Sequence, residues 1–288
     1  IFRQDERIII EKIYIVKGDL DIEQGNIKFN GDVEVKGDVR SGLTIETDGD
    51  IFVHGHVGGC NLTAGGSITI RKGIQGRNKC EIIAGRDVAC SFIERCRINA
   101  NGSVYADSIL DSEVVAREMV KVCSKKGLIV GGNVTGIQGV EAKNVGNDVG
   151  VLTTLYTGVL HDDIVRLSEI DEKIQKIKGD VEILDKNLKI YDSLDGSRRT
   201  KETEAVRMKI LRAKVLEAAE LKKLQDQHDA LELEISTARK DAIIHITGVV
   251  YAGTKVCIGR SSLVTKESFK DVIYKSVNEE VVQTSGGE

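Results

Sequence analysis

Three pairs of acidic residues stand two positions apart, a spacing that places both side chains on one face of a strand. The pairs are Asp19 with Asp21, Glu46 with Asp48, and Asp48 with Asp50. Glycosidases need two carboxyl groups at a set separation. Aromatic residues, which form platforms for sugars, make up only 4% of the chain. A solvated outer face therefore explains the pairs better, and a polysaccharide-binding or polysaccharide-cleaving protein that uses outward carboxylates is the alternative.

Two histidines, His54 and His56, flank a glycine and form the one local pair whose spacing suggests metal binding. A metal site needs further ligands, and no third ligand stands nearby in the sequence. We therefore expect surface histidines, and a metal-dependent enzyme that uses them is a third hypothesis. The glycine-rich motifs of nucleotide-binding loops are absent. The sequence predicts no catalytic residue, no metal and no cofactor.

Six cysteines are scattered along the chain at irregular intervals and without a CxxC pair. They are Cys60, Cys80, Cys90, Cys96, Cys123 and Cys257. A zinc ribbon would have two close pairs, and a secreted disulfide scaffold would be shorter and richer in cysteine. The spacing favours small buried apolar side chains in a reducing cytoplasm.

The elements that carry these residues are indicated by a recurring motif, a glycine followed by a polar residue and then Val or Ile. The motif begins at Gly31, Gly49, Gly66, Gly85 (with one insertion) and Gly102. A second set, Gly37, Gly55 and Gly73, runs alongside the first. Both sets recur at intervals of about 18 residues, which indicates an internal structural repeat.

Apolar and polar residues alternate after each of these glycines. Val33 and Val35 are followed one period later by Ile51 and Val53. This alternation predicts half-buried strands, and three strands of about five residues with glycine turns fill one rung of a parallel β-helix. We therefore predict a mainly β protein, a single-stranded parallel β-helix with about 18 residues per rung. We expect right-handed coiling, because the strict six-residue repeat of left-handed β-helices is not kept.

A seven-residue repeat replaces the alternation after Leu160. One heptad position holds Leu167, Ile174, Val181 and Leu188, and the other holds Ile170, Ile177, Leu184 and Tyr191. A second seam has Leu221, His228 and Ile235 at one position and Leu224, Leu231 and Ala238 at the other. Such seams predict a coiled coil. Upstream, we expect Leu211, Val215 and Ala218 to continue the second seam after a skip in register.

A turn at Asp195, Gly196 and Ser197 separates the two seams. Two long helices joined by a short turn pack antiparallel, so the sequence predicts a long antiparallel coiled-coil hairpin. Together with Arg198 and Arg199, the turn residues form the tip, which we name as the candidate docking site for a partner.

The β pattern resumes after the second seam, so the hairpin is predicted to be an insertion. We expect a parallel β-helix over residues 1–158, the hairpin over 159–243, and a return to the β-helix with a cap and a C-terminal tail over 244–288. The base of the hairpin and Ser268–Val277 are the candidate caps for the last rung, whose strand edge would otherwise be unpaired. We expect Thr284–Glu288 to be disordered.

Three stretches resemble the flagellar assembly protein A (FapA) family. They are Gly25–Val33 (GNIKFNGDV), Lys126–Gly132 (KGLIVGG) and Tyr251–Gly259 (YAGTKVCIG). Members often have Pro where this chain has Ala252. The resemblance implies a bacterial, cytoplasmic protein linked to flagellar assembly and cell-pole organisation, with no reaction attributed to it. The β-helix also resembles bactofilins and the C-terminal domain of MinC, which are assembly modules.

These observations and the resemblance together predict a non-enzymatic scaffold or adaptor in flagellar assembly or cell-pole organisation, with the β-helix as platform and the hairpin as an arm for flagellar or polar protein partners. The location that the resemblance implies is the cytoplasm, at the cell pole. The net charge is −4 and no segment is strongly basic, which argues against nucleic-acid binding. No apolar run is long enough for a membrane span. A homodimer or higher oligomer is expected but not required, because the hairpin can satisfy its own seam.

Overall fold

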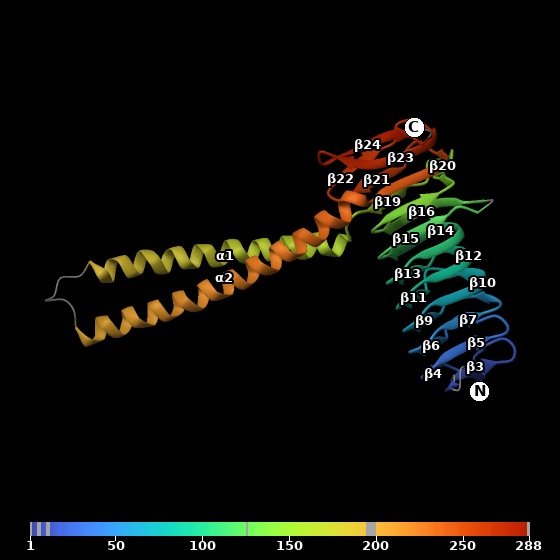
Figure 1. The fold of residues 1–288 in the computed structure, drawn as a ribbon, viewed down its shortest axis with the longest axis horizontal. Coiled ribbons are helices and arrows are strands. Elements are labelled where there is room, and N and C mark those ends of the chain that lie inside the picture. The colour runs from blue at the N-terminus through green and yellow to red at the C-terminus, as the bar shows by residue number, and fades with distance from the viewer. Residues whose placement is uncertain (1, 5–6, 10–11, 125, 194–199, 287–288) are drawn as a thin grey trace. The chain divides into compact units, whose positions relative to one another are not determined.

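The computed structural model describes residues 2–4, 7–9, 12–124, 126–193 and 200–286. The chain forms two compact units, Ile1–Leu160 with Ala238–Glu288, and His161–Thr237. The first unit is a parallel β-solenoid and the second is a pair of helices (Figure 1). The predicted fold class, mainly β with a helical insertion, is therefore confirmed.

The described strands before the helices are β1 (Phe2–Gln4), β2 (Arg7–Ile9), β3 (Ile13–Val16), β4 (Ile27–Phe29), β5 (Asp32–Val35), β6 (Thr44–Thr47), β7 (Ile51–Val53), β8 (His56–Val57), β9 (Asn61–Ala64), β10 (Ile68–Gln75), β11 (Glu81–Ala84), β12 (Val88–Glu94), β13 (Arg97–Ala100), β14 (Val104–Ala116), β15 (Met119–Val122), β16 (Leu128–Gly136), β17 (Gly139–Ala142), β18 (Asn144–Val145) and β19 (Thr153–Thr157). The helices are α1 (His161–Asp192) and α2 (Lys201–Asp241). The strands after them are β20 (Ile243–Val250), β21 (Lys255–Ile258), β22 (Ser261–Val264), β23 (Phe269–Val277) and β24 (Glu280–Ser285).

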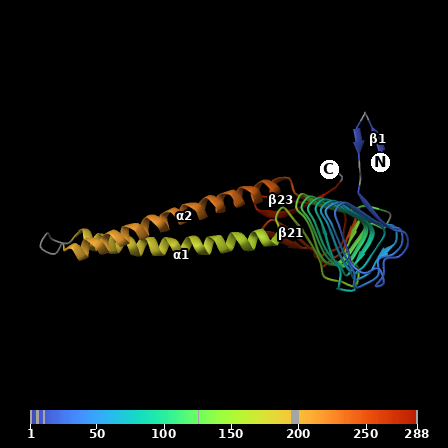
Figure 2. The same cartoon turned by 90° about the horizontal axis from the view of Figure 1, so that it is seen from below.

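Each rung contributes strands to three parallel sheets, which superimpose along the stack in Figure 2. The first sheet contains β3, β5, β7, the first parts of β10, β12 and β14, then β15, β17 and β20. The third sheet contains β4, β6, β9, β11, β13, the end of β14, the second part of β16, β19 and β21. The second sheet lies between them in chain order and includes β8 and β18. Right-handed coiling stays a prediction.

The core is a set of aliphatic columns that run along the stack. Val33 pairs with Ile51 and Ile51 with Ile68, one rung apart each time, and all three side chains are buried. Ile82 and Ile98 form a similar column in the third sheet. Because β-branched side chains pack well on a pleated surface, the repeating Val and Ile positions supply most of the apolar burial that stabilises the unit.

The helices interrupt the chain between two neighbouring rungs. In the first sheet Val120 pairs with Val140 of the next rung, and Val140 pairs with Ile244, which follows both helices in the sequence. The chain thus leaves the solenoid after β19, forms α1 and α2, and returns as β20 in register with the rung before. The helical pair is therefore an insertion that leaves the ladder of the first sheet continuous.

Antiparallel strands cover the end of the stack at the C-terminal side. β23 pairs antiparallel with β20, and β24 pairs antiparallel with β23. β23, which spans all but the first residue of the candidate cap Ser268–Val277, thus pairs with the last parallel strand of the first sheet. The expectation of a disordered tail is wrong for its described part, because Thr284 pairs with Ile273 and Ser285 with Val272.

A buried tyrosine in this cap predicts a loss of stability at alkaline pH. Tyr274 is fully buried, and its hydroxyl has no hydrogen-bond partner within the part of the chain that the structure describes. Burial raises the pKa of Tyr274 to about 12, above the usual value of about 10. The folded state therefore disfavours the ionised form. The contribution of neutral Tyr274 to the free energy of unfolding is therefore fully present below about pH 10. That contribution falls by about 2 kcal/mol as the pH rises to about 12.

Replacing Tyr274 with phenylalanine removes both the unpaired hydroxyl and the titration. We expect Tyr274→Phe to raise the free energy of unfolding at neutral pH by about 1 kcal/mol and to flatten the alkaline decline. Urea unfolding at pH 7 to 11 measures both effects. An unchanged alkaline decline in the variant would show that other groups cause it.

Candidate functional site

The two helices pack through the predicted heptad positions. Ile170, Ile174 and Leu224 are buried together. Half-buried Ile177, Leu221 and Leu231 pack against them. The seam positions predicted on α1 are all buried or half-buried, and the described positions of the second seam on α2, from Leu221 to Ile235, are too. These side chains form an apolar seam between the two helices of the hairpin.

Ion pairs between the helices show their antiparallel register. Arg207 Nε lies 2.7 Å from Asp192 Oδ1, and Lys214 Nζ lies 2.5 Å from Asp185 Oδ1. One heptad back along α1 thus corresponds to one heptad forward along α2. The hydrogen bond with Asp192 raises the pKa of Arg207. These contacts bring charged side chains of α2 to the seam in the half of the hairpin that includes Asp192.

The expected skip in register is wrong. The seam continues through α2 without interruption. Arg207, Ile210, Lys214 and Glu217 stand at its heptad positions upstream of Leu221, and all four are half-buried. The structural reason is the pair of acidic residues on α1, Asp185 and Asp192, which accept the charged ends of Lys214 and Arg207.

An apolar stripe remains on the surface of α2 as a consequence. It consists of Met208, Leu211, Val215 and Ala218, separated alternately by three and four positions. Met208 is 39% exposed, Leu211 37% and Val215 62%. Residues at this spacing lie on one side of a helix. The side chains Leu211, Val215 and Ala218, which the sequence assigned to the internal seam, therefore belong to an exposed apolar face of the hairpin.

The predicted docking tip lies outside the described residues. Asp195, Gly196, Ser197, Arg198 and Arg199 fall within 194–199, where the structure gives no description. Their role as a docking site stays a prediction. The apolar stripe on α2 is a separate surface that the sequence reasoning missed.

Aspartates at the corners of the solenoid hold neighbouring rungs together. Asp19 Oδ1 accepts a hydrogen bond from the backbone N–H of Asp38 at 2.9 Å, and Asp19 Oδ2 lies 2.9 Å from Arg40 Nη2. The Asp38 N–H and then Arg40 lower the pKa of Asp19. Asp38 Oδ1 in turn accepts a hydrogen bond from the N–H of His56. Asp19 and Asp38 thus each accept a hydrogen bond from a backbone N–H of the next rung.

A second corner repeats this arrangement with Asp50. Its Oδ1 accepts hydrogen bonds from the backbone N–H of Ser67 at 2.7 Å and from Arg86 at 3.0 Å. The N–H of Asp50 itself donates to Asp32 Oδ1. Of the other acidic residues, Glu46 pairs with Lys28 at 2.8 Å and Asp48 with Asn30 at 3.0 Å. These contacts give the outward carboxylates a structural role between rungs and do not favour glycosidase chemistry.

The two histidines of the sequence motif have different partners. His54 Nε2 lies 2.7 Å from Glu34 Oε1, and the rings of His56 and Phe92 lie with centroids 5.8 Å apart and planes tilted by 46°. Hydrogen bonds from Lys36 and then His54 lower the pKa of Glu34. Across the described residues, no group of three or more His, Cys, Asp or Glu side chains is placed to hold a metal ion.

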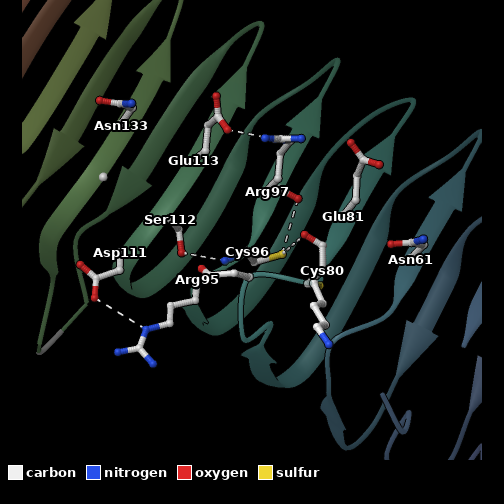
Figure 3. A pocket seen from close by; sticks show the side chains of 13 residues that line it. Asn61, Cys80, Glu81, Arg95, Cys96, Arg97, Asp111, Ser112, Glu113 and Asn133 are labelled. Carbon is white, nitrogen blue, oxygen red and sulfur yellow. Dashed lines mark hydrogen bonds and ion pairs between the residues drawn. The ribbon is translucent and has the colours of Figure 1, made fainter. Parts of the chain in front are cut away.

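A surface cavity of about 560 Å³ opens beside the third sheet (Figure 3). Its lining includes Cys80, Cys96, Arg95 and Asp111. Arg97 Nε lies 2.9 Å from Glu113 Oε2 at the same surface. Sequence reasoning missed this cluster, because the unequal gaps between the cysteines show no motif until the rungs are aligned.

Comparison with known families decides the assignment. The family model for the flagellar assembly protein A beta solenoid domain matches residues 12–281, which includes the helical insertion. The chain belongs to the FapA family. This confirms the resemblance of the three sequence stretches and supports a role in flagellar assembly. No curated protein and no solved structure matches the FapA chain. Among the helices the structure describes, none is long and apolar enough to cross a membrane.

Proposed function

We propose that this FapA-family chain is a non-enzymatic scaffold or adaptor that works in the cytoplasm, at the cell pole, and binds flagellar components through its hairpin. The solenoid serves as a platform, because its stacked sheets and buried aliphatic columns give it a continuous core. The family's role in flagellar assembly supports the class of partner. The observation that carries the proposal is the apolar stripe on α2.

The stripe has the form of a helix-binding surface. Apolar side chains on one side of a helix accept the apolar face of a partner helix, as in coiled coils. Exposed apolar residues at regular spacing are unfavourable in water unless a partner covers them. The partner proposed here is an amphipathic helix of a flagellar component, and self-association of the chain is an outcome that the test detects.

Charged substitutions in the stripe test the proposal. We expect Leu211→Glu/Val215→Glu to abolish capture of flagellar components from bacterial lysate, because a carboxylate that a partner must desolvate costs several kcal/mol. The double variant Val206→Glu/Leu216→Glu is the matched control. It places the same charges on exposed apolar residues of the same helix, 39% and 72% exposed, outside the stripe.

The captured proteins are identified and quantified by mass spectrometry, and the mass of each purified variant is measured by light scattering. Loss of capture in the stripe variant alone supports the proposal. Equal capture by wild type and stripe variant contradicts it. A wild-type dimer that the stripe variant converts to a monomer would identify a second copy, rather than a flagellar helix, as the occupant.

A further inference from the structure

Three cysteines form a column across consecutive rungs of the third sheet. The residues that follow them, Asn61, Glu81 and Arg97, pair in register. The Glu81 N–H donates to the Cys60 carbonyl at 3.3 Å, and the Arg97 N–H donates to the Cys80 carbonyl at 3.0 Å. Cys60, Cys80 and Cys96 are therefore direct neighbours along the stack.

The spacing of the column suits a disulfide. Adjacent strands lie about 4.8 Å apart, within the Cα separations of about 4.4–6.8 Å that disulfides span. All six cysteines are free thiols in the structure. Cys96 Sγ lies 3.5 Å from the carbonyl oxygen of Cys80. The spacing of the strands thus permits a disulfide between two neighbouring thiols of the column.

The middle thiol of the column is chemically distinct from its neighbours. Hydrogen bonds from the side chains of Cys60 and Cys96 lower the pKa of Cys80, although burial opposes this shift. The same hydrogen bonds and burial raise the pKa of Cys60 and Cys96. The two neighbouring thiols thus favour ionisation of Cys80 within the column, and the thiolate is the reactive form of cysteine.

Small reactants can approach Cys80 from one side. Cys80 is 6% exposed and Cys96 4% exposed. Both line the cavity of about 560 Å³ in Figure 3. Cys60 is 2% exposed and lines a different cavity. The shared cavity makes Cys96 the partner of Cys80.

We propose that Cys80 and Cys96 form a peroxide-sensitive thiol pair that closes to a reversible disulfide between two rungs. Cys80 gives up its proton, the resulting thiolate attacks one oxygen of hydrogen peroxide, the O–O bond breaks, and the hydroxide released takes up a proton equivalent to the one that Cys80 lost to become water. The Cys96 sulfur then attacks the sulfur of the Cys80 sulfenic acid. The S–S bond forms, the S–O bond breaks, and the Cys96 proton leaves with the hydroxide as a second water. Two thiols are oxidised and one peroxide is reduced.

Peptide mapping of the full chain tests the pair. The reduced protein is treated with hydrogen peroxide, free thiols are blocked with N-ethylmaleimide, and the digest is analysed by mass spectrometry with and without dithiothreitol. We expect a Cys80–Cys96 cross-linked peptide that disappears on reduction. Cys80→Ser should lose it, and Cys96→Ser should instead accumulate Cys80 sulfenic acid that dimedone traps.

Two further variants separate the pair from general oxidation. Cys60→Ser should keep the cross-link, and so should Cys257→Ser, which removes a buried cysteine outside the column. Serine suits the column, because Ser112 occupies its next place and accepts a hydrogen bond from the Cys96 N–H at 3.2 Å. Circular dichroism confirms the fold of each variant. A cross-link of Cys80 to Cys60 or Cys90, or oxidation of exposed Cys123 with Cys80 left unmodified, would overturn the proposal.

Discussion

Replacing Gly85 with alanine is expected to destabilise the solenoid by about 3 kcal/mol. A Cβ atom at Gly85 would overlap the carbonyl oxygen of Gly65 in the neighbouring rung. At this corner, backbone hydrogen bonds join the two rungs. One of them runs from the Gly85 N–H to the Ala64 carbonyl oxygen at 2.9 Å. Because the obstacle is backbone, relief of the clash requires the two rungs to separate locally.

The matched control is Gly18→Ala. Nothing lies within 4 Å of a Cβ built at Gly18, so this variant should stay within about 0.5 kcal/mol of wild type. Urea unfolding followed by circular dichroism gives both values. If Gly85→Ala and Gly18→Ala unfold at the same urea concentration, the close stacking at this corner is not a determinant of stability.

The second large effect is expected in the hairpin. Ile174→Glu should unfold the packed part of the hairpin, because it places a carboxylate in the cluster with Ile170 and Leu224. Loss of the buried isoleucine alone costs about 3 kcal/mol, and the buried charge adds to that cost. The helices contain 32 and 41 residues, so their loss should remove most of the helical signal in circular dichroism.

Ile183→Glu is the control on the same helix. Ile183 is 56% exposed, whereas Ile174 is 6% exposed. We expect Ile183→Glu to keep the helical signal, and both variants to keep the β signal because the solenoid has its own core. Equal helical content in wild type and Ile174→Glu would contradict the seam, and joint loss of helix and solenoid would contradict two independent cores.

Repetition made most of the fold predictable. Val33, Val35, Ile51 and Val53 were assigned to the interior from alternation alone, and all four are buried. The seam of α1 was predicted from a heptad repeat in which both seam positions hold apolar or aromatic residues throughout. In both cases the same pattern of apolar and polar residues recurs in each rung or each heptad. One sequence therefore contains enough copies of the pattern for it to be recognised.

The failures occur where a residue's environment depends on a partner segment. Leu211 and Val215 fit a seam by apolarity, but the charged residues Arg207 and Lys214 take those places. Their acidic partners belong to α1. The heptad pattern of α2 alone does not predict ion pairs with residues of another helix. The Thr284 strand was missed for the same reason, because its stability comes from pairing with Ile273.

The cysteine column illustrates a different limit. The intervals from Cys60 to Cys80 and from Cys80 to Cys96 are unequal, so the three residues match no fixed period and no ligand motif. Rung length varies at the corners, and only the pairing of Glu81 with Asn61 and with Arg97 shows that the three thiols are neighbours. Residues that become neighbours across corners of different length cannot be aligned until the strand pairing between rungs is known.

Affinity capture with two forms of the full chain tests most directly whether the hairpin carries recognition and the solenoid serves as the platform. Wild type and Ile174→Glu are immobilised at equal density and exposed to bacterial lysate, and bound flagellar components are quantified by mass spectrometry. We predict capture by wild type and its loss in Ile174→Glu, whose solenoid remains folded. Equal capture of the same flagellar components by both forms would contradict this division of roles and place recognition on the solenoid.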